Sequence, residues 1–223
     1  MERRRWLQKA KRVVVKVGSA LLSTPDDTLD TRFVAKLARE IKALRDTGRE
    51  VILVSSGAIA AGMLACGCRR RPRTIPAQQA LAAIGQPRLM QAYARSFARH
   101  GLAVAQILLT AADIHHRQRY AHARNALFEL LRLGVVPVFN ENDTLAVEEL
   151  KFGDNDALSA HITNLAGADC LVILTDVDGL YTANPRTTPG AERVPEVARI
   201  DAAVRAAGSA RAAWPPNCSP PRW

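Results

Sequence analysis

The sequence is poor in the features that build disulfide scaffolds and membrane spans. Only four of its 223 residues are cysteines. Cys66 and Cys68 are one residue apart, which is not the spacing of a zinc knuckle or a C-x-x-C redox pair. The apolar runs, such as 51–54 and 170–174, are far too short to cross a bilayer. No apolar stretch follows the N-terminal arginines, so we expect no signal peptide and a cytoplasmic location. From the cysteine spacing we expect no metal–thiolate site and no structural disulfide.

Acidic residues are also scarce relative to basic ones. There are 21 Asp and Glu against 31 Lys and Arg, a net charge of +10, which raises a nucleic-acid-binding interpretation. The basic residues cluster only at 3–5 and 69–73 and otherwise alternate with acids, and only six are lysines. This distribution favours a solvated surface over a phosphate-binding groove, while a hydrophobic content of 48% excludes a disordered chain.

Short apolar runs alternate with helical stretches along the chain. Strands are predicted at 13–17, 51–54, 104–109, 135–139 and 170–174, and helices at 31–47, 76–100, 120–133 and 156–165. The second helix is expected to break at Gln86–Pro87. Continuous Val/Ile/Leu strands separated by helices predict an α/β fold, with a mostly parallel sheet covered by helices on both faces. Ligands bind beyond the carboxyl ends of such strands.

Small and basic residues follow the first two strands. Lys16 lies one residue before the end of the first strand, Gly18 and Ser19 follow it, and Ser56 and Gly57 follow the second strand. Small residues there let backbone N–H groups approach an anion. Neither a P-loop nor a G-x-G-x-x-G motif is present. By itself, a strand-end lysine is more often a surface residue whose chain covers apolar neighbours.

Polar clusters follow the fourth and fifth strands. Asn140 to Asp143 come after the fourth strand, and Asp154, Asn155 and Asp156 come shortly after them. These residue types also cap helices and close turns, but two clusters at the end of one strand indicate the base of a ligand-binding site. Thr175 and Asp176 follow the fifth strand, where they would contact a nucleotide or simply form a connecting loop.

Five segments together carry a family resemblance. In order they are Val13-Val-Val-Lys-Val-Gly-Ser, Val54-Ser-Ser-Gly-Ala-Ile, Phe139-Asn-Glu-Asn-Asp-Thr, Phe152-Gly-Asp-Asn-Asp and Leu174-Thr-Asp-Val-Asp-Gly-Leu-Tyr. With Gln79-Ala-Leu-Ala-Ala-Ile-Gly-Gln, this series resembles the glutamate 5-kinases of the amino acid kinase superfamily over residues 10–208. The resemblance implies a three-layer sandwich of the carbamate-kinase type.

The same resemblance implies an activity and a set of site residues. The reaction would transfer the γ-phosphoryl group of ATP to the side-chain carboxylate of L-glutamate, giving L-glutamyl 5-phosphate in the first step of proline biosynthesis. The implied roles are catalysis by Lys16 and Asp156, glutamate binding by Ser56, Gly57, Asp143 and Asn155, and ATP binding by Lys16, Gly18, Ser19, Thr175 and Asp176. Mg²⁺ would arrive with the nucleotide and needs no protein ligand set. A homo-oligomer and feedback inhibition by proline are also expected.

The end of the chain departs from the family. Where its members have Gly-Thr-Gly-Gly-Met-x-Thr-Lys, with a second phosphate-facing lysine, residues 209–223 form a tail containing Trp214, Trp223 and four prolines. Permitted codons for residues 209–218, read from the third base, encode Gly-Thr-Gly-Gly-Met-Ala-Thr-Lys-Leu. We therefore expect a frameshift near Gly208, an incomplete kinase domain over 1–208, no PUA domain, and impaired activity and solubility.

Three alternatives stay open at this point. The first is another amino acid kinase, such as a carbamate, acetylglutamate or uridylate kinase, although Asn140-Glu-Asn-Asp argues against that. The second is a remnant that binds ligand without catalysis, which an ATP-dependent glutamate assay distinguishes. The charge alone suggests a nucleic-acid-binding protein, for which a salt-dependent titration is the test.

Overall fold

The computed structural model describes residues 7–24, 29–146, 155–185 and 187–200, together with residues 202 and 204. The chain divides into two compact units, Met1–Thr175 and Asp176–Trp223. The tail at 209–223, Asp154 and Cys218 lie outside the described residues. No helix among the residues described is both long and apolar enough to cross a membrane.

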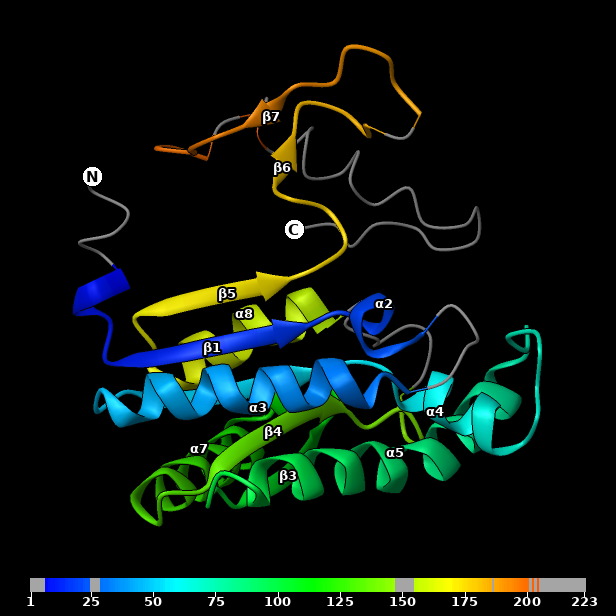
Figure 1. The fold of residues 1–223 in the computed structure, drawn as a ribbon, viewed down its shortest axis with the longest axis horizontal. Coiled ribbons are helices and arrows are strands. Elements are labelled where there is room, and N and C mark those ends of the chain that lie inside the picture. Colours follow the sequence, from blue (N-terminus) through cyan, green and yellow to red (C-terminus); the bar gives the residue numbers. More distant parts are fainter. Residues whose placement is uncertain are drawn as a thin grey trace. The chain divides into compact units, whose positions relative to one another are not determined.

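The first unit is built on one five-stranded parallel sheet. Its strands are β1 (Arg12–Val17), β2 (Glu50–Ser55), β3 (Val104–Leu109), β4 (Val136–Glu141) and β5 (Cys170–Leu174). They lie in the order β3-β4-β2-β1-β5, and every pairing is parallel. The arrowheads of β1 and β5 point the same way in Figure 1, so the segments that follow the strands gather at one edge of the sheet.

Helices connect the strands and cover both faces of the sheet. They are α2 (Ser19–Leu22), α3 (Thr31–Asp46), α4 (Ala58–Ala65), α5 (Ile75–Ala98), α6 (Ala111–His115), α7 (Arg117–Arg132) and α8 (Asn155–Ala166). One core cluster joins α3 and α5 to the sheet, and a second joins α7 and α8 to its other face (Figure 1). The predicted sandwich of helix, sheet and helix layers is confirmed.

The alternation of side chains along β1 explains both cores. Val13, Val15 and Val17 pack with α3, whereas Val14 packs with α8. Successive strand residues point to opposite faces, so Lys16 points to the same face as Val14, toward α8. A lysine in this position needs an anionic partner, because an isolated buried charge is very unfavourable.

The predicted break at Gln86–Pro87 is wrong. α5 runs without interruption from Ile75 to Ala98 with Pro87 inside it. Proline has helical φ but lacks an N–H, so the helix loses one hydrogen bond at this point. On both sides of Pro87, residues such as Leu81, Leu89 and Phe97 are buried, and this packing keeps the helix continuous.

The two edge strands are less buried than their apolar sequences suggest. All five residues of β5 are half-buried, and only Leu109 of β3 is fully buried. Cys170 packs against the core from this partly exposed position, and Cys66 is exposed. Full burial on both faces applies instead to the middle strands.

The second unit contains a small hairpin. β6 (Leu180–Tyr181) pairs antiparallel with β7 (Arg193–Val194). The Tyr181 hydroxyl donates to the Asp178 carboxylate at 2.7 Å, and this bond lowers the pKa of that carboxyl group. Neither strand had been predicted, because a two-residue strand has no detectable hydrophobic period.

Candidate functional site

Lys16 and Asp156 meet at the carboxyl edge of the sheet. The ammonium nitrogen of Lys16 lies 2.5 Å from Oδ1 of Asp156, which stands in the first turn of α8. The Lys16 side chain is 9% exposed and the Asp156 side chain 29%. The pair thus places a mostly buried cation beside a partly exposed carboxylate. The structure brings together the two residues predicted to be catalytic.

The turn after β2 is held close to β1. The Ser56 N–H donates to the Val17 carbonyl at 3.1 Å, and Gly57 has a φ of 103°, which a side chain would strain. An added Cβ at Gly57 would lie 3.3 Å from Cδ1 of Leu22. The sequence Ser-Ser-Gly therefore forms a tight turn into α4, with the Ser56 side chain at the same edge of the sheet as Lys16.

A buried tyrosine on α5 is hydrogen-bonded to the first serine of this turn. The Ser55 and Tyr93 hydroxyl oxygens are 2.8 Å apart, and both residues are completely buried. Burial raises the pKa of Tyr93 to about 12, an effect that the Ser55 hydrogen bond partly opposes. Sequence reasoning did not single out Tyr93, because its partner lies 38 residues away in the chain.

Asn155 connects α8 to the serine turn. Its side-chain nitrogen lies 2.8 Å from the Ser55 carbonyl oxygen, 2.9 Å from the Ser56 hydroxyl oxygen and 2.9 Å from Oδ1 of Asn140. Two of the predicted glutamate-binding residues, Ser56 and Asn155, are thus in direct contact. Asn140 is 2% exposed, and we had not predicted it as a site residue although it stood in the polar cluster after the fourth strand.

Asp143 lines a pocket beside these groups. The pocket has a volume of about 200 Å³. Its polar wall includes Gln86, Asn142 and Asp143, and Ala58 at the start of α4 forms part of its apolar wall. Gln86 accepts a hydrogen bond from Nδ2 of Asn140 at 2.9 Å. The half-buried Asp143 carboxylate is therefore placed in the same neighbourhood as Asn155, with Gln86 and Asn140 between them.

Gly18 differs in one detail from its predicted role. We expected its backbone N–H to face an anion, but that N–H donates to the Leu174 carbonyl at 3.0 Å. The Gly18 N–H is used in this way because the bond continues the β1–β5 ladder by one residue past Val17. An added Cβ would lie 3.8 Å from the Lys16 ammonium nitrogen, so glycine still keeps the space beside that group open.

The remaining predicted nucleotide residues lie on either side of Gly18. Ser19 is exposed at the start of α2, and Thr175 directly follows the strand residue that Gly18 contacts. Asp176 begins the second unit and is exposed. The structure thus gathers Lys16, Gly18, Ser19 and Thr175 around the ends of β1 and β5. The ATP roles of Ser19, Thr175 and Asp176 stay predictions.

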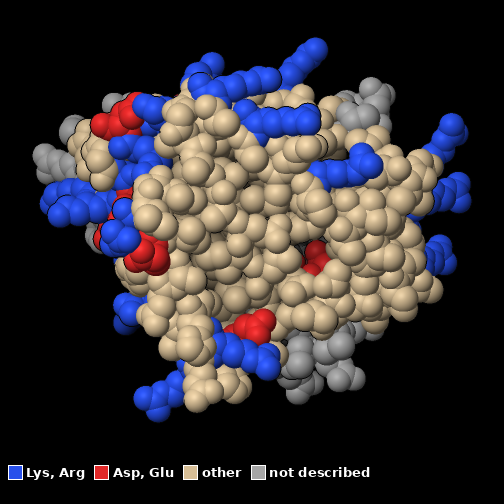
Figure 2. Space-filling model, turned by 90° about the horizontal axis from the view of Figure 1, so that it is seen from below, with Lys and Arg blue, Asp and Glu red and all other residues tan. Residues whose placement is uncertain are grey.

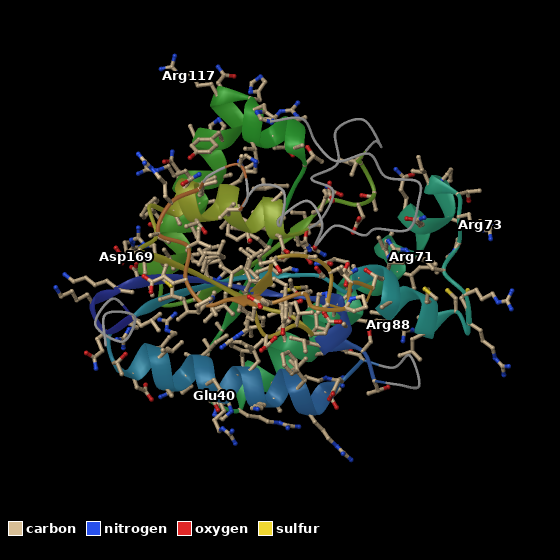
Figure 3. All side chains as sticks on the ribbon, turned by 90° about the horizontal axis from the view of Figure 1, so that it is seen from above. Glu40, Arg71, Arg73, Arg88, Arg117 and Asp169 are labelled. Carbon is tan, nitrogen blue, oxygen red and sulfur yellow. The ribbon has the colours of Figure 1, made fainter. Side chains whose placement is uncertain are left out.

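Basic side chains do not gather on the faces shown. On the face in Figure 2, Lys and Arg of the described residues stand around the margin and the centre carries few charges. In Figure 3, Arg71 and Arg73 project from the α4–α5 connection, and Arg117 projects from the start of α7. Such scattered cations do not form a continuous phosphate-binding stripe.

Comparison with known proteins gives a consistent result. The model of the amino acid kinase family matches residues 11–215. The chain is similar to a glutamate 5-kinase of Pelobacter propionicus, with 55% identity over 207 residues, 92% of this chain and 56% of the relative. It is 53% identical to those of Geobacter sulfurreducens, over 91% of this chain and 54% of the relative, and of Thermus thermophilus, over 89% and 54%. The chain spans about half the length of the curated relatives it matches.

Proposed function

Because the chain belongs to the amino acid kinase family, we propose that it transfers the γ-phosphoryl group of ATP to the side-chain carboxylate of L-glutamate. The product would be L-glutamyl 5-phosphate, as in the first step of proline biosynthesis. The observation that carries this proposal is the mostly buried Lys16–Asp156 pair at the sheet edge that also holds Ser56 and Asn155. We place the reaction in the cytoplasm.

The chemistry demands charge stabilisation and positioning more than proton transfer. The acceptor carboxylate is already ionised at neutral pH, so no general base is needed. Two anions must be brought together, and negative charge on the transferring group must be stabilised. In this proposal, the Lys16 ammonium supplies that charge. Asp156, 2.5 Å away, would fix its position as it faces the phosphates.

The acceptor side is formed by Ser56, Gly57, Asp143 and Asn155. The half-buried Asp143 carboxylate in the pocket wall would pair with the substrate ammonium group. Ser56 and Asn155, held together at 2.9 Å, would hydrogen-bond a substrate carboxylate. The left-handed Gly57 lets the substrate approach the backbone at the start of α4.

The donor side would use Gly18, Ser19 and Thr175 around the ends of β1 and β5, with Asp176 as the next residue of the chain. Mg²⁺ would be coordinated chiefly by nucleotide phosphate oxygens, because it retains waters and binds few protein groups. A homo-oligomer and inhibition by proline are part of the same proposal.

The test is an acceptor panel. ADP formation from Mg·ATP is measured with L-glutamate, carbamate, N-acetylglutamate and UMP as alternative acceptors. The proposal expects ADP formation above background with L-glutamate alone. A preference for another acceptor would support another amino acid kinase activity, whereas calorimetric glutamate binding without ADP formation would support the binding-only alternative.

A further inference from the structure

A row of hydrogen-bonded amide side chains leads from Gln106 on the edge strand β3 to Asn155 on α8. Nε2 of Gln86 on α5 donates to Oε1 of Gln106 on β3, and Nδ2 of Asn140 on β4 donates to Oε1 of Gln86. Nδ2 of Asn155 on α8 donates in turn to Oδ1 of Asn140, and all three distances are 2.9 Å. Gln86, Asn140 and Asn155 are 8%, 2% and 9% exposed, whereas Gln106 is exposed.

Two backbone groups determine which way these amides face. The Glu141 N–H can only donate, and it lies 2.9 Å from Oδ1 of Asn140. The Nδ2 group of Asn140 must therefore face Gln86, which must accept through Oε1. At the other end, the Ser55 carbonyl can only accept, so the Asn155 side chain presents its nitrogen to it at 2.8 Å. The observed orientation is the one in which every donor meets an acceptor.

The position of Gln86 is set by a close helix crossing. An added Cβ at Gly85 would lie 1.8 Å from the Ala58 carbonyl oxygen, and one at Gly62 would lie 1.9 Å from the Leu81 carbonyl oxygen. Two glycines thus let α4 and α5 touch backbone to backbone. This contact fixes Gln86 relative to the Ser56–Gly57 turn that begins α4.

We propose that Gln86 is a positioning residue for the acceptor site, holding Asn140, and through it Asn155, in the orientation that binds glutamate. The inference rests on the proposed function. Without an acceptor at position 86, the buried Nδ2 group of Asn140 loses its partner, and the Asn140 side chain shifts to bring this group to another acceptor or to water. The shift lengthens the hydrogen bond that Oδ1 of Asn140 accepts from Asn155. Ser56 and Asn155 would then separate.

The same substitution at two glutamines of α5 distinguishes positioning from packing. Gln86→Met preserves volume and removes the acceptor for Nδ2 of Asn140. Gln78→Met is the matched control, because Gln78 donates to the Pro72 carbonyl at 2.9 Å and does not line the pocket. If Gln86 acts only through packing, Gln86→Met is tolerated. If Gln86 positions Asn140, Gln86→Met weakens glutamate binding and Gln78→Met does not.

The experiment is calorimetric titration of the whole 223-residue chain with L-glutamate and, separately, with Mg·ATP. Loss of one neutral hydrogen bond predicts about three- to tenfold weaker glutamate binding for Gln86→Met, with ATP binding unchanged. The control Gln78→Met should bind glutamate within about twofold of wild type.

Three other results would overturn the positioning role of Gln86 or the proposed function. Glutamate binding by Gln86→Met within twofold of wild type overturns the positioning role. Equal weakening of glutamate binding by Gln86→Met and by Gln78→Met also overturns it. Absence of glutamate binding by the wild-type chain itself overturns the proposed function, and the positioning role with it.

Discussion

Lys16 stands on a strand whose neighbouring residues are valines, and its ammonium pairs with the carboxylate of Asp156 at 2.5 Å. The family motif predicted the pair, and the alternation of side chains along β1 explains why it is buried on the α8 side. The charge is therefore fixed in place before any substrate binds, which is the condition under which electrostatic stabilisation of a transition state is most effective.

Replacing Lys16 by Ala tests this role. We expect turnover to fall by at least about 100-fold, because one preorganised charge at the transferring group is lost. Glutamate affinity should stay within about twofold, since Lys16 does not contribute to the acceptor pocket. The matched control is Lys42→Ala, which removes an exposed lysine paired with Asp46 on α3 and should leave turnover unchanged. More than a tenth of wild-type turnover in the Lys16 variant would contradict the assignment.

Asp143→Ala tests the acceptor side. A charged hydrogen bond to the substrate ammonium contributes ~1.5–3 kcal/mol, so the Michaelis constant for glutamate should rise about ten- to hundredfold. The constant for ATP should change little. Steady-state kinetics with each substrate varied in turn measures both values, and an unchanged glutamate constant would remove Asp143 from the pocket.

The Tyr93 hydroxyl gives a pH-dependent prediction. Its pKa is raised to about 12 in the folded chain, against about 10 when unfolded. The unfolded state releases this proton first, so the stabilisation is complete below pH 10 and is lost as the pH rises toward 12, by about 3 kcal/mol. Denaturant unfolding between pH 9 and 11.5 should therefore show a steeper loss of stability for wild type than for Tyr93→Phe. Equal slopes for the two proteins would contradict a buried, titrating hydroxyl at this position.

At the level of helices and strands, local patterns predicted more than long-range contacts did. The apolar runs located all five strands of the sheet, because a buried parallel strand is continuously hydrophobic. The helix break predicted at Pro87 was wrong, because the effect of a proline on a helix depends on packing that the sequence does not display. Gln86, Asn140 and Tyr93 were not selected as site residues, because each acts through a partner far away in the chain, such as Asn140 with Gln86 at a separation of 54 residues.

The crossing of α4 and α5 supplies a prediction at this scale. Gly85→Ala would place a methyl group 1.8 Å from the Ala58 carbonyl oxygen, so the helices must separate at the start of α4. Overpacking of this kind costs about 1–3 kcal/mol or more, and glutamate binding should weaken because Gln86 moves. Gly67→Ala, with φ of 65° and nothing within 4 Å of the added atom, should cost only about 1–2 kcal/mol of backbone strain and leave binding intact. Equal effects of the two variants on glutamate binding would exclude a special role for the crossing.

At the scale of the whole molecule, one edge of a parallel sheet carries both halves of the proposed reaction. The predicted acceptor groups follow β2 and β4 or lie at the start of α8. The predicted donor groups follow β1 and β5. This arrangement follows from strand order, since β1 lies between β2 and β5. Lys16 on β1 would therefore stand between the two proposed substrates, where a charge that acts on the transferring group must be.

The most direct test of this account is trapping of the acyl phosphate. The 223-residue chain is incubated with Mg·ATP, L-glutamate and hydroxylamine, and the γ-glutamyl hydroxamate is quantified by mass spectrometry beside Lys16→Ala and Lys42→Ala. We predict hydroxamate that requires both ATP and glutamate. It should be equal in Lys42→Ala and at least about 100-fold lower in Lys16→Ala. No ATP-dependent hydroxamate from the wild-type chain, or equal amounts from wild type and Lys16→Ala, would contradict the account.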